Sequence, residues 1–246
     1  MKALITGASS GIGEAMAEIL TREGHDVVAV GRNEKQLKRL QENIGCACFA
    51  LDLSKTENCK ILYEKVRDVE ILINSAGFGI IGYFTEYELE RDIEMIGINI
   101  CALHILTKLY LSDMQERNFG YVLNVASIAG FLSGPQMAAY YASKSYVVRL
   151  TGALASELKS KRSNVYIGAL CPGPVKTNFN RRAGVEFSIN GKEAGTVAEY
   201  AIRNMFRRKQ FILPGFQIKL VKFGVRFLPD RVSAYLAGKM QTQKQK

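Results

Sequence analysis

Short apolar runs alternate with longer segments of helical spacing along nearly the whole chain. Strand-length runs occur at "ALIT" (3–6), "DVVAV" (26–30), "CACFAL" (46–51), "VEILIN" (69–74), "YVLNVA" (121–126), "VYIGAL" (165–170) and "QFIL" (210–213). Helical spacing is predicted at 11–24, 34–43, between the third and fourth runs, roughly 86–117 as two long helices, and about 140–160. Strands that are apolar throughout and separated by helices indicate a parallel sheet covered on both faces. Right-handed crossovers then predict an α/β, doubly wound, Rossmann-like fold with about seven strands in one domain.

One uncharged stretch, 120–143, is long enough to cross a bilayer. It contains Asn124, Ser127, Gly134, Pro135 and further polar residues, which make a poor lipid-facing helix. We interpret it as a buried strand, a loop and the start of a helix.

A glycine-rich loop follows the first predicted strand and opens the first predicted helix. It reads Thr6-Gly7-Ala8-Ser9-Ser10-Gly11-Ile12-Gly13. At such a turn, backbone N–H groups and the helix N-terminus favour a diphosphate, and glycines let the backbone approach it. A tight turn without a ligand is the alternative, but the strand–loop–helix context favours nucleotide binding.

The residue after the second strand indicates which nucleotide is bound. In such folds, a position about 20 residues beyond the glycines meets the adenosine ribose. Here the strand ends "VAVGRN" and places Arg32 there, with no acidic residue beside it. A guanidinium suits a 2′-phosphate through charge-assisted hydrogen bonds, although a surface arginine is also often simply solvated. Together with the glycine loop, Arg32 favours NADP(H) over NAD(H).

Two adjacent tyrosines precede a lysine in "AAYYASKSY" (138–146). Side chains four residues apart share a helix face, so Tyr140 and not Tyr141 is expected beside Lys144. A nearby ammonium group favours phenolate, and we therefore expect it to lower the pKa of Tyr140. Tyr140 would then act as a general acid toward a carbonyl oxygen, or as a base toward an alcohol. Alone, such a pair is also common as surface decoration.

The order of these and further motifs resembles the short-chain dehydrogenase/reductase family over about residues 2–215. The family's glycine loop is present as TGASSGIG, and its acidic residue after the third strand as Asp52. Its Asn-Asn-Ala-Gly signature is Asn74-Ser75-Ala76-Gly77, with serine in the second place. Its helix asparagine, catalytic serine and YxxxK motif match Asn99, Ser127 and Tyr140 with Lys144. Its Pro-Gly loop is "CPGPVKT" (171–177), which contains Pro172, Gly173, Val175 and Thr177.

The resemblance implies a role for each matched residue. Ser127 would hydrogen-bond the substrate oxygen, Lys144 would also hold the nicotinamide ribose, and Asn99 would support a water-linked proton relay. Asp52 would contact adenine, and Thr177 with its loop would contact the carboxamide end. Taken singly, Asn99 could instead cap a helix, Ser127 could end a strand with a local bond, and Asp52 could be a turn residue. The whole set favours catalysis. Tyr141 replaces a small residue and is expected to pack or to form pocket wall.

Composition adds little to this picture except at the C-terminus. The five cysteines include no CxxC pair or Cys/His cluster, so we expect free thiols and no metal site. The chain reaches its first strand at residue 2, and we expect no signal peptide and a cytoplasmic location.

Residues 216–246 depart from the family pattern and are predicted as a basic amphipathic extension after a catalytic domain at 1–215. The extension holds seven Lys or Arg residues and one acid, a net +6 out of the chain's +10. A helical wheel puts its basic residues on one stripe (Lys219, Lys222, Arg226) and its large apolar residues on another (Phe216, Leu220, Phe223, Phe227). Such a segment suits an anionic membrane surface, but it could equally cover the substrate pocket or a partner subunit. Nucleic acid is not expected.

We therefore expect an NADP(H)-dependent oxidoreductase that interconverts a small-molecule carbonyl and an alcohol. The substrate loop after Thr177 offers Phe179 and Phe187 as apolar wall, while Arg181 and Arg182 weakly favour an anionic group. A homodimer through helices 100–117 and 140–160 is expected rather than a tetramer built from the last strand and helix. The alternative is a non-catalytic dinucleotide sensor or scaffold, which would have no need of the Asn99, Ser127, Tyr140 and Lys144 set.

Overall fold

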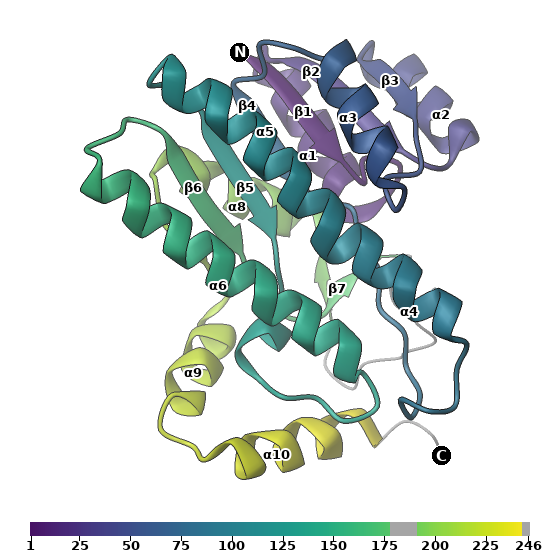
Figure 1. The fold of residues 1–246 in the computed structure, drawn as a ribbon, viewed down its shortest axis with the longest axis vertical. Coiled ribbons are helices and arrows are strands. Elements are labelled where there is room, and N and C mark those ends of the chain that lie inside the picture. Colours follow the sequence, from purple (N-terminus) through teal and green to yellow (C-terminus); the bar gives the residue numbers. More distant parts are fainter. Residues whose placement is uncertain (178–190, 243–246) are drawn as a thin grey trace.

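A seven-stranded parallel sheet forms the centre of the molecule (Figure 1). The computed structural model describes residues 1–177 and 191–242. The strands are β1 Lys2–Thr6, β2 Asp26–Gly31, β3 Ala47–Ala50, β4 Ile71–Asn74, β5 Tyr121–Val125, β6 Tyr166–Leu170 and β9 Phe211–Ile212. Their order is β3-β2-β1-β4-β5-β6-β9. The strand order therefore reverses between β1 and β4, which confirms the doubly wound, Rossmann-like prediction.

Helices cover both faces of the sheet because successive strand side chains point to opposite sides. Leu4 and Leu72 pack toward the helices α3 Thr56–Lys65, α5 Leu103–Glu116 and α6 Ala138–Ser160. Ile5 and Ile73 pack on the other face, toward α1 Gly11–Arg22, α2 Glu34–Ile44 and α8 Ala194–Phe206. Apolar cores therefore form on both faces of the sheet. Because the strands are parallel, their carboxyl ends lie together at one edge.

The region predicted as two long helices is one continuous helical stretch. α4 Leu89–Ile96 passes through a π-helical turn, Gly97–Ala102, directly into α5. Gly97 keeps right-handed helical dihedrals and therefore does not end the helix. Leu89–Glu116 is long and apolar enough to span a membrane by composition. Its buried residues Met95, Leu106 and Tyr110 belong to the core against the sheet, which is the position of a core helix in a globular domain.

The uncharged stretch 120–143 folds as predicted. It comprises β5, a short 3₁₀ turn at Ile128–Phe131 and the start of α6. Two features were not predicted from the sequence: α8, and the small parallel pair β7 Val175–Lys176 and β8 Lys192–Glu193. The apolar residues of α8 do have helical spacing, whereas β7 and β8 have two residues each and no readable period.

The C-terminal extension folds into two helices. α9 Phe216–Val225 begins at the residue where the extension was predicted to start, and α10 Asp230–Thr242 follows. Both lie beside the carboxyl-end edge of the sheet, below β5 and α6 in Figure 1. This position brings the extension to the candidate site.

Candidate active site

A cavity of about 380 Å³ lies at the carboxyl ends of the central strands, where doubly wound folds bind their ligands. Its wall includes the loops after β1, β4, β5 and β6, together with α6. The structure brings most of the predicted site residues to this wall: Gly7, Ser9, Ser10, Gly11, Ile12, Arg32, Ala76, Gly77, Ser127, Tyr140, Lys144, Pro172, Gly173, Val175 and Thr177. Gly13, Asp52, Asn74 and Asn99 are not part of it.

The glycine loop shapes one end of the cavity through close backbone packing. Gly7 has φ +69°, and a Cβ there would lie 2.7 Å from the backbone nitrogen of Ala76. A Cβ on Gly13 would lie 2.5 Å from the carbonyl oxygen of Gly7. Gly13 therefore packs α1 onto the loop instead of facing the cavity. The helix N-terminus at Gly11 is left facing the cavity, with its unpaired N–H groups available to an anion.

Thr6 ties this loop to the next one. Its hydroxyl oxygen accepts hydrogen bonds from the N–H groups of Ser75 and Ala76, each at 3.1 Å. Asn74, by contrast, points into the sheet and donates to Thr107 (3.0 Å) and Asn124 (2.9 Å). The amide of Asn74 thus ties β4 to β5 and α5, and its predicted cofactor contact stays a prediction.

Tyr140 and Lys144 share one face of α6, as the four-residue spacing predicts. The Lys144 ammonium nitrogen lies 5.8 Å from the centre of the Tyr140 ring and donates to the Val125 carbonyl at 3.0 Å. Tyr141 also behaves as predicted for a wall residue, since it lines the cavity and its ring packs tightly on Gly134.

Burial dominates the ionisation of this pair. It raises the pKa of Tyr140 to about 12, although a hydrogen bond with Ser127 acts in the opposite direction. The expected lowering of the Tyr140 pKa by Lys144 is therefore wrong for the ligand-free protein. Burial also lowers the pKa of Lys144 to about 8. Tyr140 is consequently a neutral phenol at physiological pH, the form that can donate a proton.

Ser127 combines a local bond with a bond into the site. Its hydroxyl oxygen accepts from the N–H of Ala129 at 3.1 Å and caps the 3₁₀ turn. The same side chain hydrogen-bonds Tyr140. The turn thus holds the Ser127 hydroxyl beside the phenol, where both face the cavity.

Asn99 is fully buried in the π-helical turn and acts through its neighbours. Its amide donates to the Phe78 carbonyl at 2.9 Å and to the Ser143 hydroxyl at 3.0 Å, and its oxygen accepts from the Phe78 N–H at 3.1 Å. A Cβ on Gly77 would lie 2.7 Å from that oxygen. The Asn99 side chain therefore positions the loop after β4 against α6. π-Helical turns of this kind are frequent at functional sites.

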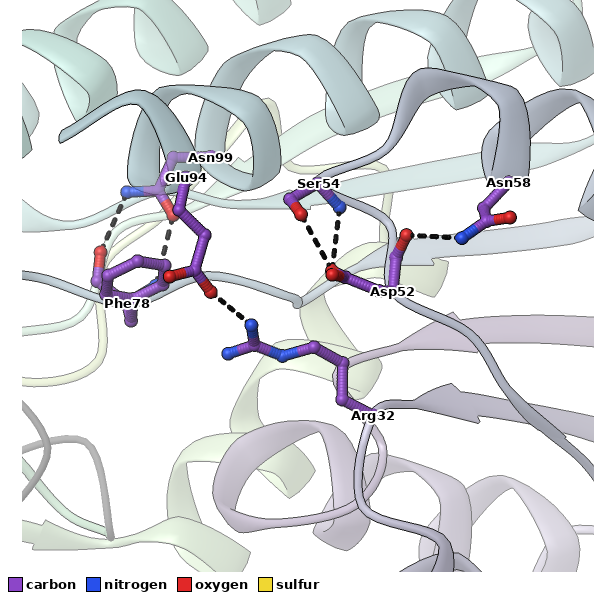
Figure 2. A network of polar contacts seen from close by, with 7 residues as sticks. All are labelled: Arg32, Asp52, Ser54, Asn58, Phe78, Glu94 and Asn99. Carbon is purple, nitrogen blue, oxygen red and sulfur yellow. Dashed lines mark hydrogen bonds and ion pairs between the residues drawn. The ribbon is translucent and has the colours of Figure 1, made fainter. Parts of the chain in front are cut away.

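Arg32 lies on the cavity wall but is paired with a residue that sequence analysis did not single out. Figure 2 shows its guanidinium bonded to the carboxylate of Glu94 on α4. Arg32 and Glu94 side chains are 48% and 35% exposed, so water screens the pair. The sequence gives no signal for this contact, because the two residues are 62 positions apart in the chain and meet only in the folded protein.

Asp52 adopts the turn role that was its alternative. Its carboxylate accepts from the Ser54 N–H at 3.1 Å and from the Ser54 hydroxyl at 2.8 Å, and its carbonyl accepts from Asn58 (Figure 2). Its neighbours Leu51 and Leu53 line the cavity instead. Both side-chain bonds of Asp52 use its Oδ1 atom, and the predicted adenine contact stays a prediction.

Much of the cavity wall is apolar. Much of it comes from residues that sequence analysis left unassigned: Phe78, Ile98, Ile128, Leu132, Met137, Ile218, Val221 and Ala237. Ile218 and Val221 belong to α9 and Ala237 to α10. One predicted placement of the C-terminal extension, over the pocket, is thus observed.

Two further predictions concern the substrate loop and metals. Phe179, Arg181, Arg182 and Phe187 lie outside the described residues. Among the described residues, no group of three or more His, Cys, Asp or Glu side chains is arranged to hold a metal ion.

Comparisons with known proteins agree on one family. The family model described as short chain dehydrogenase matches residues 1–186. An uncharacterized oxidoreductase of Staphylococcus epidermidis is 33% identical over 208 residues, which cover 81% of this chain and 88% of the relative.

Two solved structures have the same fold and are similar in sequence. A short-chain dehydrogenase from Sphingobium yanoikuyae, in complex with NADPH, has a TM-score of 0.82 at 30% identity and covers 92% of both chains. A short-chain dehydrogenase/reductase from Burkholderia phymatum, in complex with NAD, has a TM-score of 0.81 at 26% identity, covering 92% of this chain and 91% of the other. The motifs, the strand order and these matches together make the chain a member of the short-chain dehydrogenase/reductase family of oxidoreductases.

Proposed function

We propose that this protein is an NADP(H)-dependent oxidoreductase that interconverts a carbonyl and an alcohol. The observation that carries the proposal is the convergence of Ser127, Tyr140 and Lys144 in one cavity, next to the open N-terminus of α1. This cavity thus contains a proton donor (Tyr140), a hydroxyl that can bind the substrate oxygen (Ser127) and a cation (Lys144). All three lie near a helix N-terminus that suits a diphosphate.

The cavity wall fits a nicotinamide dinucleotide. Cβ atoms at Gly7 or Gly77 would occupy space that their neighbours already fill, so both loops keep their places at the cavity only as glycines. The glycine loop and α1 would hold the diphosphate, and Lys144 would reach the nicotinamide ribose. The loop from Pro172 to Thr177 would meet the carboxamide. Similar proteins bind NADPH in one case and NAD in another, and Arg32 supports NADP(H) here.

The chain's own residues would handle the proton while the bound cofactor exchanges a hydride with the carbonyl carbon. Ser127 and Tyr140 would orient the substrate oxygen between their hydroxyl groups. Tyr140, neutral because burial raises its pKa to about 12, would donate its proton as negative charge develops on that oxygen. The Lys144 ammonium would stabilise the resulting phenolate. In the reverse direction, the phenolate would accept the alcohol proton.

The apolar wall supports an apolar substrate. Phe78, Leu132, Met137, Ile218 and Val221 surround the space beside the catalytic hydroxyls. Such a wall favours a bulky ketone, aldehyde or secondary alcohol over a small hydrophilic one, since each buried CH₂ group contributes about 0.8 kcal/mol.

A turnover screen tests the proposal. Purified protein is incubated with NADPH or NADH and a panel of apolar and polar ketones and aldehydes, and cofactor oxidation is followed. Tyr140→Phe should lower kcat by about 10²- to 10⁴-fold while leaving NADPH affinity nearly intact. Tyr141→Phe is the matched control: it keeps the ring that lines the cavity and loses only a hydroxyl, so kcat should stay within the same order. A dead Tyr141→Phe protein with an active Tyr140→Phe protein would contradict the assignment.

The same screen separates the enzyme from a sensor. A non-catalytic sensor would bind NADPH and turn over none of the panel in either direction. The hydrogen-bonded Ser127–Tyr140 pair above Lys144 favours the enzyme, because a sensor gains nothing from a proton donor in its pocket.

A cytoplasmic homodimer through α5 and α6 belongs to the same proposal. The two helices lie side by side on one face of the sheet (Figure 1), and His104 of α5 is bonded to the Tyr146 hydroxyl of α6 at 2.6 Å. Their outer faces therefore form one connected surface for a second subunit. Sedimentation equilibrium of the protein without lipid would give the mass of a dimer; a monomer at micromolar concentration would contradict it.

A further inference from the structure

The outer surface of the C-terminal extension is unusually apolar. On α9 and just after it, four large apolar side chains point outward and are 54–72% exposed: Phe216, Leu220, Phe223 and Phe227. α10 adds Val232 (41%), Tyr235 (68%) and Leu236 (45%). We call these seven residues the outer apolar face. Exposed clusters of large apolar residues mark a binding surface, because soluble proteins otherwise keep such patches small.

The orientation of this face is fixed by contacts on the opposite side of the same helices. Ile218 packs on Gly173, where a Cβ would lie 2.5 Å from its Cδ1 atom. Lys222 is turned inward, with its ammonium nitrogen 5.1 Å and 4.4 Å from the ring centres of Phe131 and Phe211. The predicted basic stripe is therefore incomplete, because Lys222 anchors α9 and does not face solvent. With Ala237 buried, α9 and α10 are docked with the outer apolar face turned away from the protein.

Basic residues frame the outer apolar face. Lys219, Arg226 and Arg231 are exposed on the same two helices, and Asp230 is the one acidic residue of the extension. A second copy of this surface would bring like charges together, which opposes self-association. An anionic lipid surface offers both complementary partners, negative headgroups for the basic residues and acyl chains for the aromatic ones.

We propose that α9 and α10 dock this protein on an anionic membrane surface, with the outer apolar face inserted at the level of the headgroups. Val221 lines the cavity and is 40% exposed, so α9 carries both part of the cavity wall and part of the outer apolar face. An apolar substrate dissolved in the bilayer would therefore lie next to the cavity. Docking itself requires neither turnover nor cofactor, so it stands apart from the proposed reaction.

Vesicle binding tests the proposal without measuring activity. The full-length protein is sedimented with vesicles of phosphatidylglycerol mixed with phosphatidylcholine, or of phosphatidylcholine alone, at low and high salt. We expect binding to the mixed vesicles at low salt, weaker binding to phosphatidylcholine, and partial release by salt, because salt screens the charge contribution.

Surface substitutions separate the apolar and electrostatic contributions. Phe223→Ser with Phe227→Ser should weaken binding by more than about tenfold, since aromatic side chains contribute strongly to insertion. Lys219→Glu with Arg226→Glu should weaken it by a similar factor or more, at roughly fivefold per basic residue lost. Matched controls lie elsewhere in the fold: Ile61→Ser on α3, which is 39% exposed, and Lys159→Glu with Lys161→Glu at the far end of α6 (Figure 1). Both controls should bind as the wild type does.

Unchanged melting temperatures would show that the variants remain folded. The proposal is overturned if the wild type ignores mixed vesicles at low salt, or if the Phe223/Phe227 variant binds them as well as the controls do. It is equally overturned if that variant, without lipid, converts a wild-type dimer into a monomer, because the outer apolar face would then be a contact between subunits.

Discussion

Removing the charge of Glu94 is expected to strengthen NADPH binding. In the ligand-free protein the Glu94 carboxylate is bonded to the Arg32 guanidinium, so a 2′-phosphate would have to displace it. Because both side chains are partly exposed, this pair is worth only about 0.2–1 kcal/mol. Repulsion between the displaced carboxylate and the phosphate adds about 1 kcal/mol at the dielectric of water. Glu94→Gln should therefore tighten NADPH binding by about 8- to 30-fold.

Equilibrium fluorescence titration with NADPH and NADH measures the effect on each cofactor. NADH lacks the 2′-phosphate, and its affinity should change little in Glu94→Gln. Arg32→Ala should weaken NADPH by roughly 10- to 150-fold, because a charged hydrogen bond is worth about 1.5–3 kcal/mol, and should affect NADH far less. In the double variant the part of the gain that comes from the Arg32–Glu94 pair should vanish, and only the repulsion of about 1 kcal/mol should remain. Equal affinity of the wild type for both cofactors, or equal tightening of both in Glu94→Gln, would refute the reasoning.

Two further predictions concern the catalytic helix and the loop beside it. For carbonyl reduction, kcat/KM should fall as the pH rises through about 8. Burial holds the pKa of Lys144 at about 8, so its ammonium form is lost above that pH. Tyr140 keeps its proton up to about pH 12 and does not cause the fall. A profile that stays flat to pH 10 would contradict this. Asn99→Ala should lower the free energy of unfolding by about 2–5 kcal/mol in a urea titration, because it leaves the buried N–H and C=O of Phe78 without partners. A loss below about 1 kcal/mol would mean that water or a shifted loop replaces the amide.

Most of the fold could be predicted from periodicity alone. Strands buried on both faces read as unbroken apolar runs, and "ILIN" and "YIGAL" are fully buried as β4 and β6. The π-helical turn could not be predicted, because its residues keep helical spacing and the extra residue is accommodated only by packing against the sheet. The pair β7–β8 was missed for a different reason: two-residue strands carry no period.

The candidate site was predictable where a residue acts through local geometry. The spacing of Tyr140 and Lys144 fixes their common face, and the glycine loop follows from its place between β1 and α1. Contacts across the fold were not predictable. Arg32 is held by Glu94, 62 residues further along the chain, through a pairing that depends on the tertiary fold. The bond of Asp52 to Ser54 is local, and it corresponds to the turn role given as the alternative for Asp52. The pKa of Tyr140 was predicted to be lowered, and it is raised. The sequence shows the neighbouring Lys144 but not the burial, which has the larger effect.

The π-helical turn joins two functions of one helix. Upstream of it, α4 presents Glu94 to Arg32, and within it Asn99 holds the loop that borders Tyr140 and Lys144. Deleting one residue from Gly97–Ala102 would restore an ordinary α-helix. Because the wider π-helical turn takes up that residue with little net rotation, α4 and α5 would keep their positions, and Glu94 would stay beside Arg32. Asn99 would lose the position from which it bonds Phe78 and Ser143. The length of this single turn is therefore a point at which a deletion would loosen the loop beside the catalytic pair without any substitution in the cofactor pocket.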